Sequence, residues 1–141
     1  MKKILISFVA LVLIIGSFLA LSYLDFSDVE GTISITLIDE IGDTISSKEY
    51  DFTNEDTLFS ILDKNYDLGC ANSSYQLSEV CEKGLFTSRI LLEINTLKTD
   101  WRNSYISIYE NEEYSTQGID NISINDGDKF VFEYKLVGGD N

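Results

Sequence analysis

Alternating hydrophobic and polar residues predict a β-hairpin early in the chain. In segment 32–38, every second residue is a large aliphatic residue that faces the same side of an extended strand: Ile33, Ile35 and Leu37. A turn at 39–43 leads into a second candidate strand at 44–52. We therefore expect a hairpin with one buried face.

A short amphipathic helix is predicted to follow the hairpin. In LFSILDKNY, residues 58–66, the aliphatic residues fall at positions i, i+3 and i+4: Leu58, Ile61 and Leu62. Asp56 and Thr57 come directly before this segment and are good N-cap candidates. The apolar stripe of the helix is expected to pack against the hairpin.

Three further strand patterns complete the chain after a polar loop at 67–83. They occupy residues 85–94, 101–109 and 130–136. The predicted order is ββαβββ, an α+β fold of the β-grasp type in one domain at 31–137. One domain is also what a chain of 141 residues can support with a single core.

The N-terminus carries an uncharged apolar run at residues 4–24. At 1.5 Å per residue a helix of this length reaches about 30 Å, the thickness of a bilayer core. Lys2 and Lys3 precede the run and acidic residues follow it, so the positive-inside rule places the rest of the chain outside. We expect residues 1–24 to be a single-pass membrane anchor, or a signal peptide cleaved near Ser22 that would release a secreted domain.

Composition excludes several functional classes. The chain has 24 acidic and 10 basic residues, a formal charge of −14, so it would repel phosphate backbones and nucleic-acid binding is not expected. It has no histidine, which excludes cysteine–histidine and serine–histidine hydrolases. A paired-carboxylate hydrolase is a distant alternative, and the chain is expected not to be an enzyme.

The two cysteines, Cys70 and Cys81, bracket the polar loop on the predicted exterior side. Disulfides persist in that environment, and these residues are the only available pair, so a Cys70–Cys81 disulfide is expected. A zinc site of two cysteines and carboxylates is an alternative with few of the usual ligands.

The stretch Asn125-Asp126-Gly127-Asp128 could hold a cation or form a turn. An EF-hand type loop needs oxygen ligands at alternate positions, and the fifth position counted from Asp126 is Phe130. Asn, Asp and Gly tolerate positive φ, which a tight turn into the last strand requires. We expect a turn here, and no metal site.

Aromatic residues gather around the middle loop and the fourth strand: Tyr75, Trp101, Tyr105, Tyr109 and Tyr114. Flat rings with polar edges suit stacking on a planar or sugar ligand, so these are the candidate ligand-binding residues. The alternative is structural: Tyr105 and Tyr109 could cover the sheet, and Trp101 is expected to plug the core.

Several segments in order resemble the DUF4430 family, the transcobalamin-like C-terminal domain. They are 56–62 (DTLFSIL), Gly84-Leu85-Phe86, Trp101 with 105–111 (YISIYEN), Gly118-Ile119-Asp120, and 126–128 (DGD) before Phe130 and Phe132. The family's asparagine–glycine turn is replaced by Asn111-Glu112-Glu113, which predicts a longer hairpin tip.

The resemblance implies an extracytoplasmic module, and its transcobalamin relative closes over a corrinoid. With no histidine to coordinate cobalt, any corrinoid contact here would use packing and hydrogen bonds. The expected function is a membrane-tethered or secreted binding module without a resident cofactor. The alternative is a cell-surface protein-interaction or structural domain.

Overall fold

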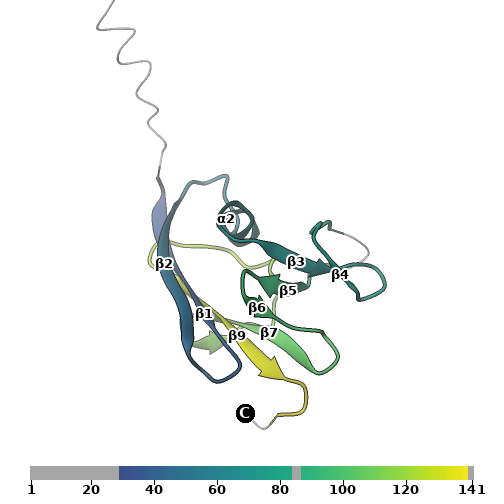
Figure 1. The fold of residues 1–141 in the computed structure, drawn as a ribbon. Coiled ribbons are helices and arrows are strands. Elements are labelled where there is room, and N and C mark those ends of the chain that lie inside the picture. The colour runs from purple at the N-terminus through teal and green to yellow at the C-terminus, as the bar shows by residue number, and fades with distance from the viewer. Residues whose placement is uncertain (1–28, 84–86, 140–141) are drawn as a thin grey trace, which may run out of the picture.

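The computed structural model describes residues 29–83 and 87–139. Within these residues the chain forms one helix, α2 (Leu58–Asn65), and strands in two sheets (Figure 1). The strands are β1 (Gly31–Ile38), β2 (Thr44–Phe52), β3 (Leu68–Ala71), β4 (Leu77–Ser78), β5 (Leu91–Ile94), β6 (Leu97–Lys98), β7 (Ser104–Glu110), β8 (Glu113–Tyr114) and β9 (Lys129–Leu136).

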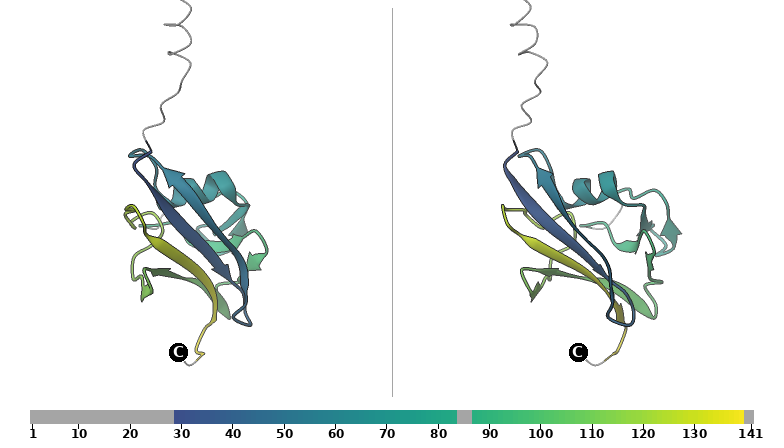
Figure 2. Two further views of the ribbon diagram at one scale, coloured as in Figure 1. Left: turned by 90° about the vertical axis from the view of Figure 1, so that its left-hand side faces the viewer. Right: turned by 60° about the vertical axis from the view of Figure 1, so that its left-hand side comes forward.

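The large sheet has the order β2-β1-β9-β7-β8. The predicted hairpin is confirmed, since β1 pairs antiparallel with β2, and β1 also pairs in parallel with the last strand, β9. The alternating residues point into the core and are almost fully buried: Ile33, Ile35, Leu37, Phe130 and Phe132. Helix α2 and the small sheet lie on one side of these strands (Figures 1 and 2).

Helix α2 begins and packs as its sequence predicts. The Thr57 hydroxyl accepts a hydrogen bond from the Ser60 amide at 3.1 Å, and the Ser60 hydroxyl accepts one from the Thr57 amide at 2.8 Å. These two bonds satisfy donors that a helix start otherwise leaves unpaired. The apolar stripe joins the same core as β1 and β9 and is buried: Leu58, Ile61 and Leu62.

The predicted α+β fold with the order ββαβββ is wrong. The described residues are mostly β, with one short helix and a second sheet of order β4-β3-β5-β6. Two of its strands, β3 and β4, come from the segment 67–83 that was expected to be a polar loop. Of the predicted strand 85–94, the structure describes residues 87–94, and within these the strand structure is limited to β5.

Strands as short as β3 and β4 carry too few residues for a period of two to be recognised. Tertiary packing instead defines β3, in which Gly69 lies so close to its neighbours that an added Cβ would meet Leu77 Cδ1 at 2.7 Å. The pairing of Cys70 with Ser78 and with Leu91 then holds β3 between β4 and β5. Hydrophobic periodicity alone contains none of this information.

The predicted membrane segment at 4–24 lies outside the described residues, as do residues 84–86. In the described ranges 29–83 and 87–139, no helix is long and apolar enough to cross a membrane. The anchor and its alternative, a signal peptide cleaved near Ser22, therefore stay predictions from sequence.

The turn at 125–128 is confirmed. The Asp128 amide donates to the Asn125 carbonyl at 3.1 Å, and Gly127 has φ of +85°. The carboxylates serve the fold: Asp126 accepts from the Thr32 amide at 2.9 Å, and Asp128 accepts from the Asn125 amide at 2.8 Å and from Asn111 Nδ2 at 2.9 Å.

The tip of the β7–β8 hairpin is tight rather than long, contrary to the expectation from sequence. Glu110 pairs with Glu113, which leaves only Asn111 and Glu112 in the turn, with φ of +51° and +73°. Two central residues with positive φ are typical of a type I′ turn, whose second position favours glycine. Asn111 tolerates this conformation, and its side-chain oxygen accepts a hydrogen bond from the Lys129 amide at 3.0 Å.

Replacing Glu112 with glycine is expected to stabilise the fold. Glycine adopts positive φ without a steric cost, so Glu112→Gly should raise the free energy of unfolding by about 0.5–1 kcal/mol, measured by urea denaturation. Glu112→Ala is the matched control, because it removes the same charge but keeps a Cβ. Equal gains from both variants would show that charge repulsion, not backbone conformation, limits stability at this turn.

Candidate functional site

Three of the candidate tyrosines lie together on the solvent face of the large sheet. Ile106 and Ile108 of β7 pack against the core, so the odd-numbered residues Tyr105 and Tyr109 face the other way. Tyr114 of β8 pairs directly with Tyr109, and their rings meet edge to face with centroids 5.8 Å apart. This geometry is one that aromatic pairs prefer.

These tyrosines line a hollow on the sheet face, called here the outer hollow. Its volume is about 530 Å³, and its walls are Tyr105, Tyr109, Tyr114 and Lys135. Lys135 Nζ forms an ion pair with Glu133 at 3.0 Å, and this hydrogen bond raises the pKa of the Lys135 ammonium. The cation of the outer hollow therefore stays protonated at neutral pH and already has an acidic partner.

A second hollow opens at the edge of β7 and is called here the edge hollow. Its volume is about 230 Å³. It is lined by Trp101, Tyr114, and residues 89–91, 105–108 and 115–119. Tyr105 and Tyr114 line both hollows, so the two adjoin.

The edge hollow exists because β8 is short. In the described part of the chain, β8 pairs with β7 only at Tyr109 and Glu110. On its other side, β7 pairs with β9 at every residue from Ser104 to Glu110. After Tyr114 the chain leaves the sheet, with the Ser115 amide still donating to the Ile108 carbonyl at 2.8 Å. The remaining edge of β7 therefore borders the hollow instead of another strand.

Trp101 is not a core plug, and that expectation is wrong. It lies in the turn before β7, has φ of +63°, and is 40% exposed. The Asp100 carboxylate holds this turn by accepting bonds from the Asn103 amide and Nδ2 and from the Ser104 and Arg102 amides. These hydrogen bonds, chiefly those from Asn103, lower the pKa of Asp100 to about 2.

Tyr75 reaches the same region from the β3–β4 connection. Its ring stacks on Trp101, with centroids 6.3 Å apart and planes 14° from parallel. The tight turn that presents it is held by Asn72, whose side-chain oxygen accepts bonds from the Ser74 and Gln76 amides at 2.9 and 3.0 Å. All five candidate aromatic residues therefore lie in or beside the two hollows.

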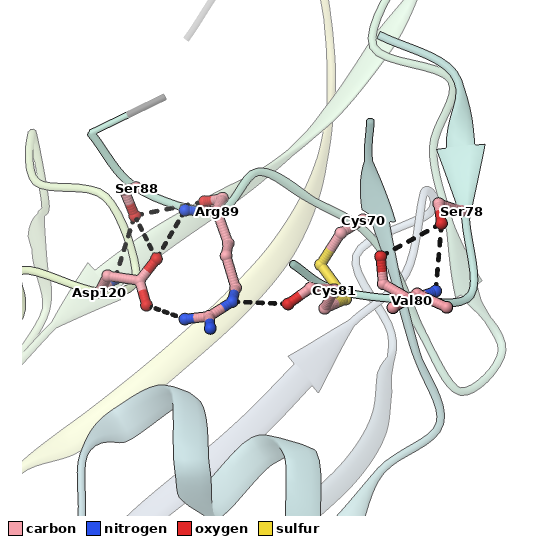
Figure 3. Close-up of a disulfide and its surroundings, with 7 residues drawn as sticks. All are labelled: Cys70, Ser78, Val80, Cys81, Ser88, Arg89 and Asp120. Carbon is pink, nitrogen blue, oxygen red and sulfur yellow. Dashed lines mark hydrogen bonds and ion pairs between the residues drawn. A yellow bond between two sulfur atoms is a disulfide. The ribbon is translucent and has the colours of Figure 1, made fainter. Parts of the chain in front are cut away.

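The predicted Cys70–Cys81 disulfide is confirmed (Figure 3). It closes the loop 70–81, which includes Tyr75. Arg89 contacts this loop directly: its Nε donates a hydrogen bond to the Cys81 carbonyl at 2.7 Å. The same guanidinium forms an ion pair with Asp120, whose carboxylate also accepts the Arg89 amide at 2.6 Å. The guanidinium carbon lies 4.0 Å from the Phe59 ring centroid, in cation–π geometry.

Several lining residues were missed from the sequence. Arg89 carries no motif, and the segment 115–119 has no periodic pattern, so nothing in their local sequence indicates a shared site. Lys135 follows Glu133 by two residues in β9, so the period of a strand places both on the same face, but that period does not show which residue of another strand lies beside Lys135. The pairing of β7 with β9 brings Lys135 beside Tyr105.

The described residues contain no cluster of metal-binding side chains. Among them, no three Asp, Glu or Cys side chains have an arrangement that could hold a metal ion. Cys70 and Cys81 are consumed by the disulfide, which rules out the alternative of a zinc–thiolate site.

Comparison with known proteins supplies a family and a fold relative. No curated protein matches the chain. Among solved structures, a protein from Ruminococcus gnavus ATCC 29149, described as a "putative metal binding protein", is similar with a TM-score of 0.53 and 16% identity, over 77% of this chain and 99% of that one. At this identity the likeness concerns the fold alone. The model of DUF4430, a domain of unknown function, matches residues 55–135, and the chain therefore belongs to the DUF4430 family.

Proposed function

We propose that this chain is an extracytoplasmic binding module that holds a small ring-bearing ligand against Tyr105 and Tyr114. The observation that carries the proposal is the position of these two tyrosines, which form walls of both the outer hollow and the edge hollow. Ligand sites are typically concave, with apolar or aromatic walls and a few polar groups. The two hollows have this composition.

The size of the hollows suits a small molecule. Ligand pockets commonly measure roughly 300–1,000 Å³. The outer hollow, at about 530 Å³, falls in this range, and the edge hollow, at about 230 Å³, lies just below it. A ligand that stacks on tyrosine would gain apolar contact while its polar edge stays near the phenol hydroxyls.

Charge favours a neutral or cationic ligand. The chain has a formal charge of −14, and the cation of each hollow already has an acidic partner: Arg89 with Asp120 and Lys135 with Glu133. A corrinoid, which the family resemblance implies, would contact the site by packing and hydrogen bonding only, since the chain has no histidine. The metal-binding description of the R. gnavus protein is not extended to this chain, because the described residues offer no ligand set.

The proposed location outside the membrane is supported by two features. The apolar run at 4–24 is long enough for an anchor, and the disulfide is of a kind that persists in oxidising compartments. The domain would then present its hollows to molecules in the extracytoplasmic space.

A second candidate function is protein interaction through the edge of β7. Between Ser104 and Ser107 this strand has no partner strand on the side of the edge hollow within the described residues. Exposed strand edges can accept an extended segment of another protein as an added strand. A folded domain that binds no small molecule would favour this second function.

Fluorescence titration tests the binding proposal, because Trp101 is the sole tryptophan and lines the edge hollow. The full chain, in a detergent whose head group carries no sugar, would be titrated with corrinoids including cobalamin, haem, nucleosides and monosaccharides. At least one ring-bearing class should quench Trp101 saturably. Tyr114→Ala should weaken that binding by about 1–3 kcal/mol.

Ile41→Ala is the matched control, since Ile41 is 76% exposed in the β1–β2 turn and lines neither hollow. It should leave the titration unchanged. Fluorescence that stays flat across every class, with circular dichroism showing a folded protein, would refute ring binding and favour protein interaction.

A further inference from the structure

We propose that the outer hollow and the edge hollow are consecutive subsites of one groove for a neutral oligosaccharide. This inference rests on the proposed function and names the ligand class for the same site. It predicts a ligand of at least two linked rings, one in each hollow, whereas the proposed function requires only one ring.

The two hollows adjoin because they share lining residues. Tyr105 and Tyr114 line both of them, while Tyr109 and Lys135 line only the outer hollow and Trp101 lines only the edge hollow. The outer hollow lies on the face of β7 and the edge hollow lies along the edge of the same strand. A ligand that fills both hollows would therefore bend from the face over the edge beside these two tyrosines, which a flexible linkage between rings allows and a fused planar system does not.

The chemical groups in the groove match a sugar. The apolar face of a pyranose ring can stack on an aromatic ring, and its hydroxyls need donors and acceptors at the ring edge. The residues that line the edge hollow include one aromatic residue with an indole ring, Trp101, and the polar stretch Ser115-Thr116-Gln117. The outer hollow offers three phenol rings and the Lys135 ammonium.

Charge separates neutral from acidic sugars. Arg89 is paired with the buried carboxylate of Asp120, and Lys135 is paired with Glu133, so neither hollow presents an uncompensated cation. A uronate, sulfate or phosphate group entering the groove would meet the field of a chain with a formal charge of −14. Neutral hexose or N-acetylhexosamine units avoid this repulsion.

The test is a length series measured by calorimetry on the full chain in sugar-free detergent. The probes are neutral saccharides of one to four rings built from glucose, N-acetylglucosamine, mannose or galactose, with uronate oligomers for comparison. In at least one series the disaccharide or a longer member should bind at least tenfold tighter than the monosaccharide. Uronate oligomers of equal length should bind more weakly than the neutral ones.

Tyr109 variants assign the second ring to the outer hollow, because Tyr109 does not line the edge hollow. Tyr109→Ala should abolish most of the tenfold gain with length and leave monosaccharide affinity within about twofold. Tyr109→Phe keeps the ring and should retain most of the gain. Ile41→Ala again serves as the control and should change neither value.

Each other outcome overturns the inference in a distinguishable way. Saturable monosaccharide binding without a gain in longer members would refute the two-subsite groove and leave ring binding intact. Binding of corrinoids, haem or nucleosides but of no neutral saccharide would refute the ligand class alone. Binding of no compound in either titration would refute the proposed function together with this inference.

Discussion

Arg89→Met is expected to lower the free energy of unfolding by about 3–5 kcal/mol. The Asp120 side chain is 8% exposed, and Arg89 is its ion-pair partner. Methionine keeps the apolar stem but leaves the buried carboxylate without a counter-charge, which is the costly way to break a buried pair. The variant also loses the bond from Nε to the Cys81 carbonyl. Chemical denaturation of the full chain would measure the effect.

A double variant and a matched ion pair isolate the cause. Adding Asp120→Asn to Arg89→Met removes the orphaned charge, so the double variant should recover part of the loss. Lys98→Met removes the pair of Lys98 with Glu93, but that lysine is 63% exposed, so its loss should cost only about 0–1 kcal/mol. If Arg89→Met and Lys98→Met cost the same, the Asp120 pair behaves as a surface pair and the prediction is wrong.

Opening the Cys70–Cys81 disulfide is expected to destabilise the fold by about 3 kcal/mol. The cysteines are 11 residues apart, and in the chain-entropy model a crosslink over a loop of this size removes that much freedom from the unfolded chain. Adding a reductant should therefore shift the urea midpoint downward. The Cys70→Ala/Cys81→Ala variant should have a similarly lowered midpoint.

The double alanine variant also provides the control for the reductant, because its midpoint should not respond to it. The loop that the disulfide closes carries Tyr75, which stacks on Trp101, so Trp101 fluorescence should change on reduction in the parent chain alone. An unchanged midpoint after verified reduction would show that the Arg89 contacts, rather than the crosslink, hold the loop.

The candidate residues were predictable by type but not by position. Tyr105 and Tyr109 occur at i and i+4 in a strand pattern, which indicates a shared face from sequence alone. Tyr75 and Trp101 are 26 residues apart in the chain, and no local pattern relates them. Their stacking depends on two turns with positive φ, held by Asn72 and Asp100.

Some elements of the fold were also predictable from sequence, and others were not. The β1–β2 hairpin, helix α2 with its Thr57 cap, and strand β9 follow from periodicity and capping signals, and the structure confirms all of them. The small sheet does not, because β3 and β4 are too short for a detectable period and are defined by pairing across the chain. The predicted β-grasp order ββαβββ is wrong for this reason.

By itself, the sequence of this DUF4430 protein determined what local chemistry dictates: which residues alternate, where the helix starts, which two cysteines could pair, and which reactions are excluded without histidine. Only the tertiary structure decided that β8 stops after Tyr114 and leaves the edge of β7 beside Trp101. The physical reason is that a hollow is formed by side chains from distant segments, and their distances depend on strand pairing that no short window of sequence encodes.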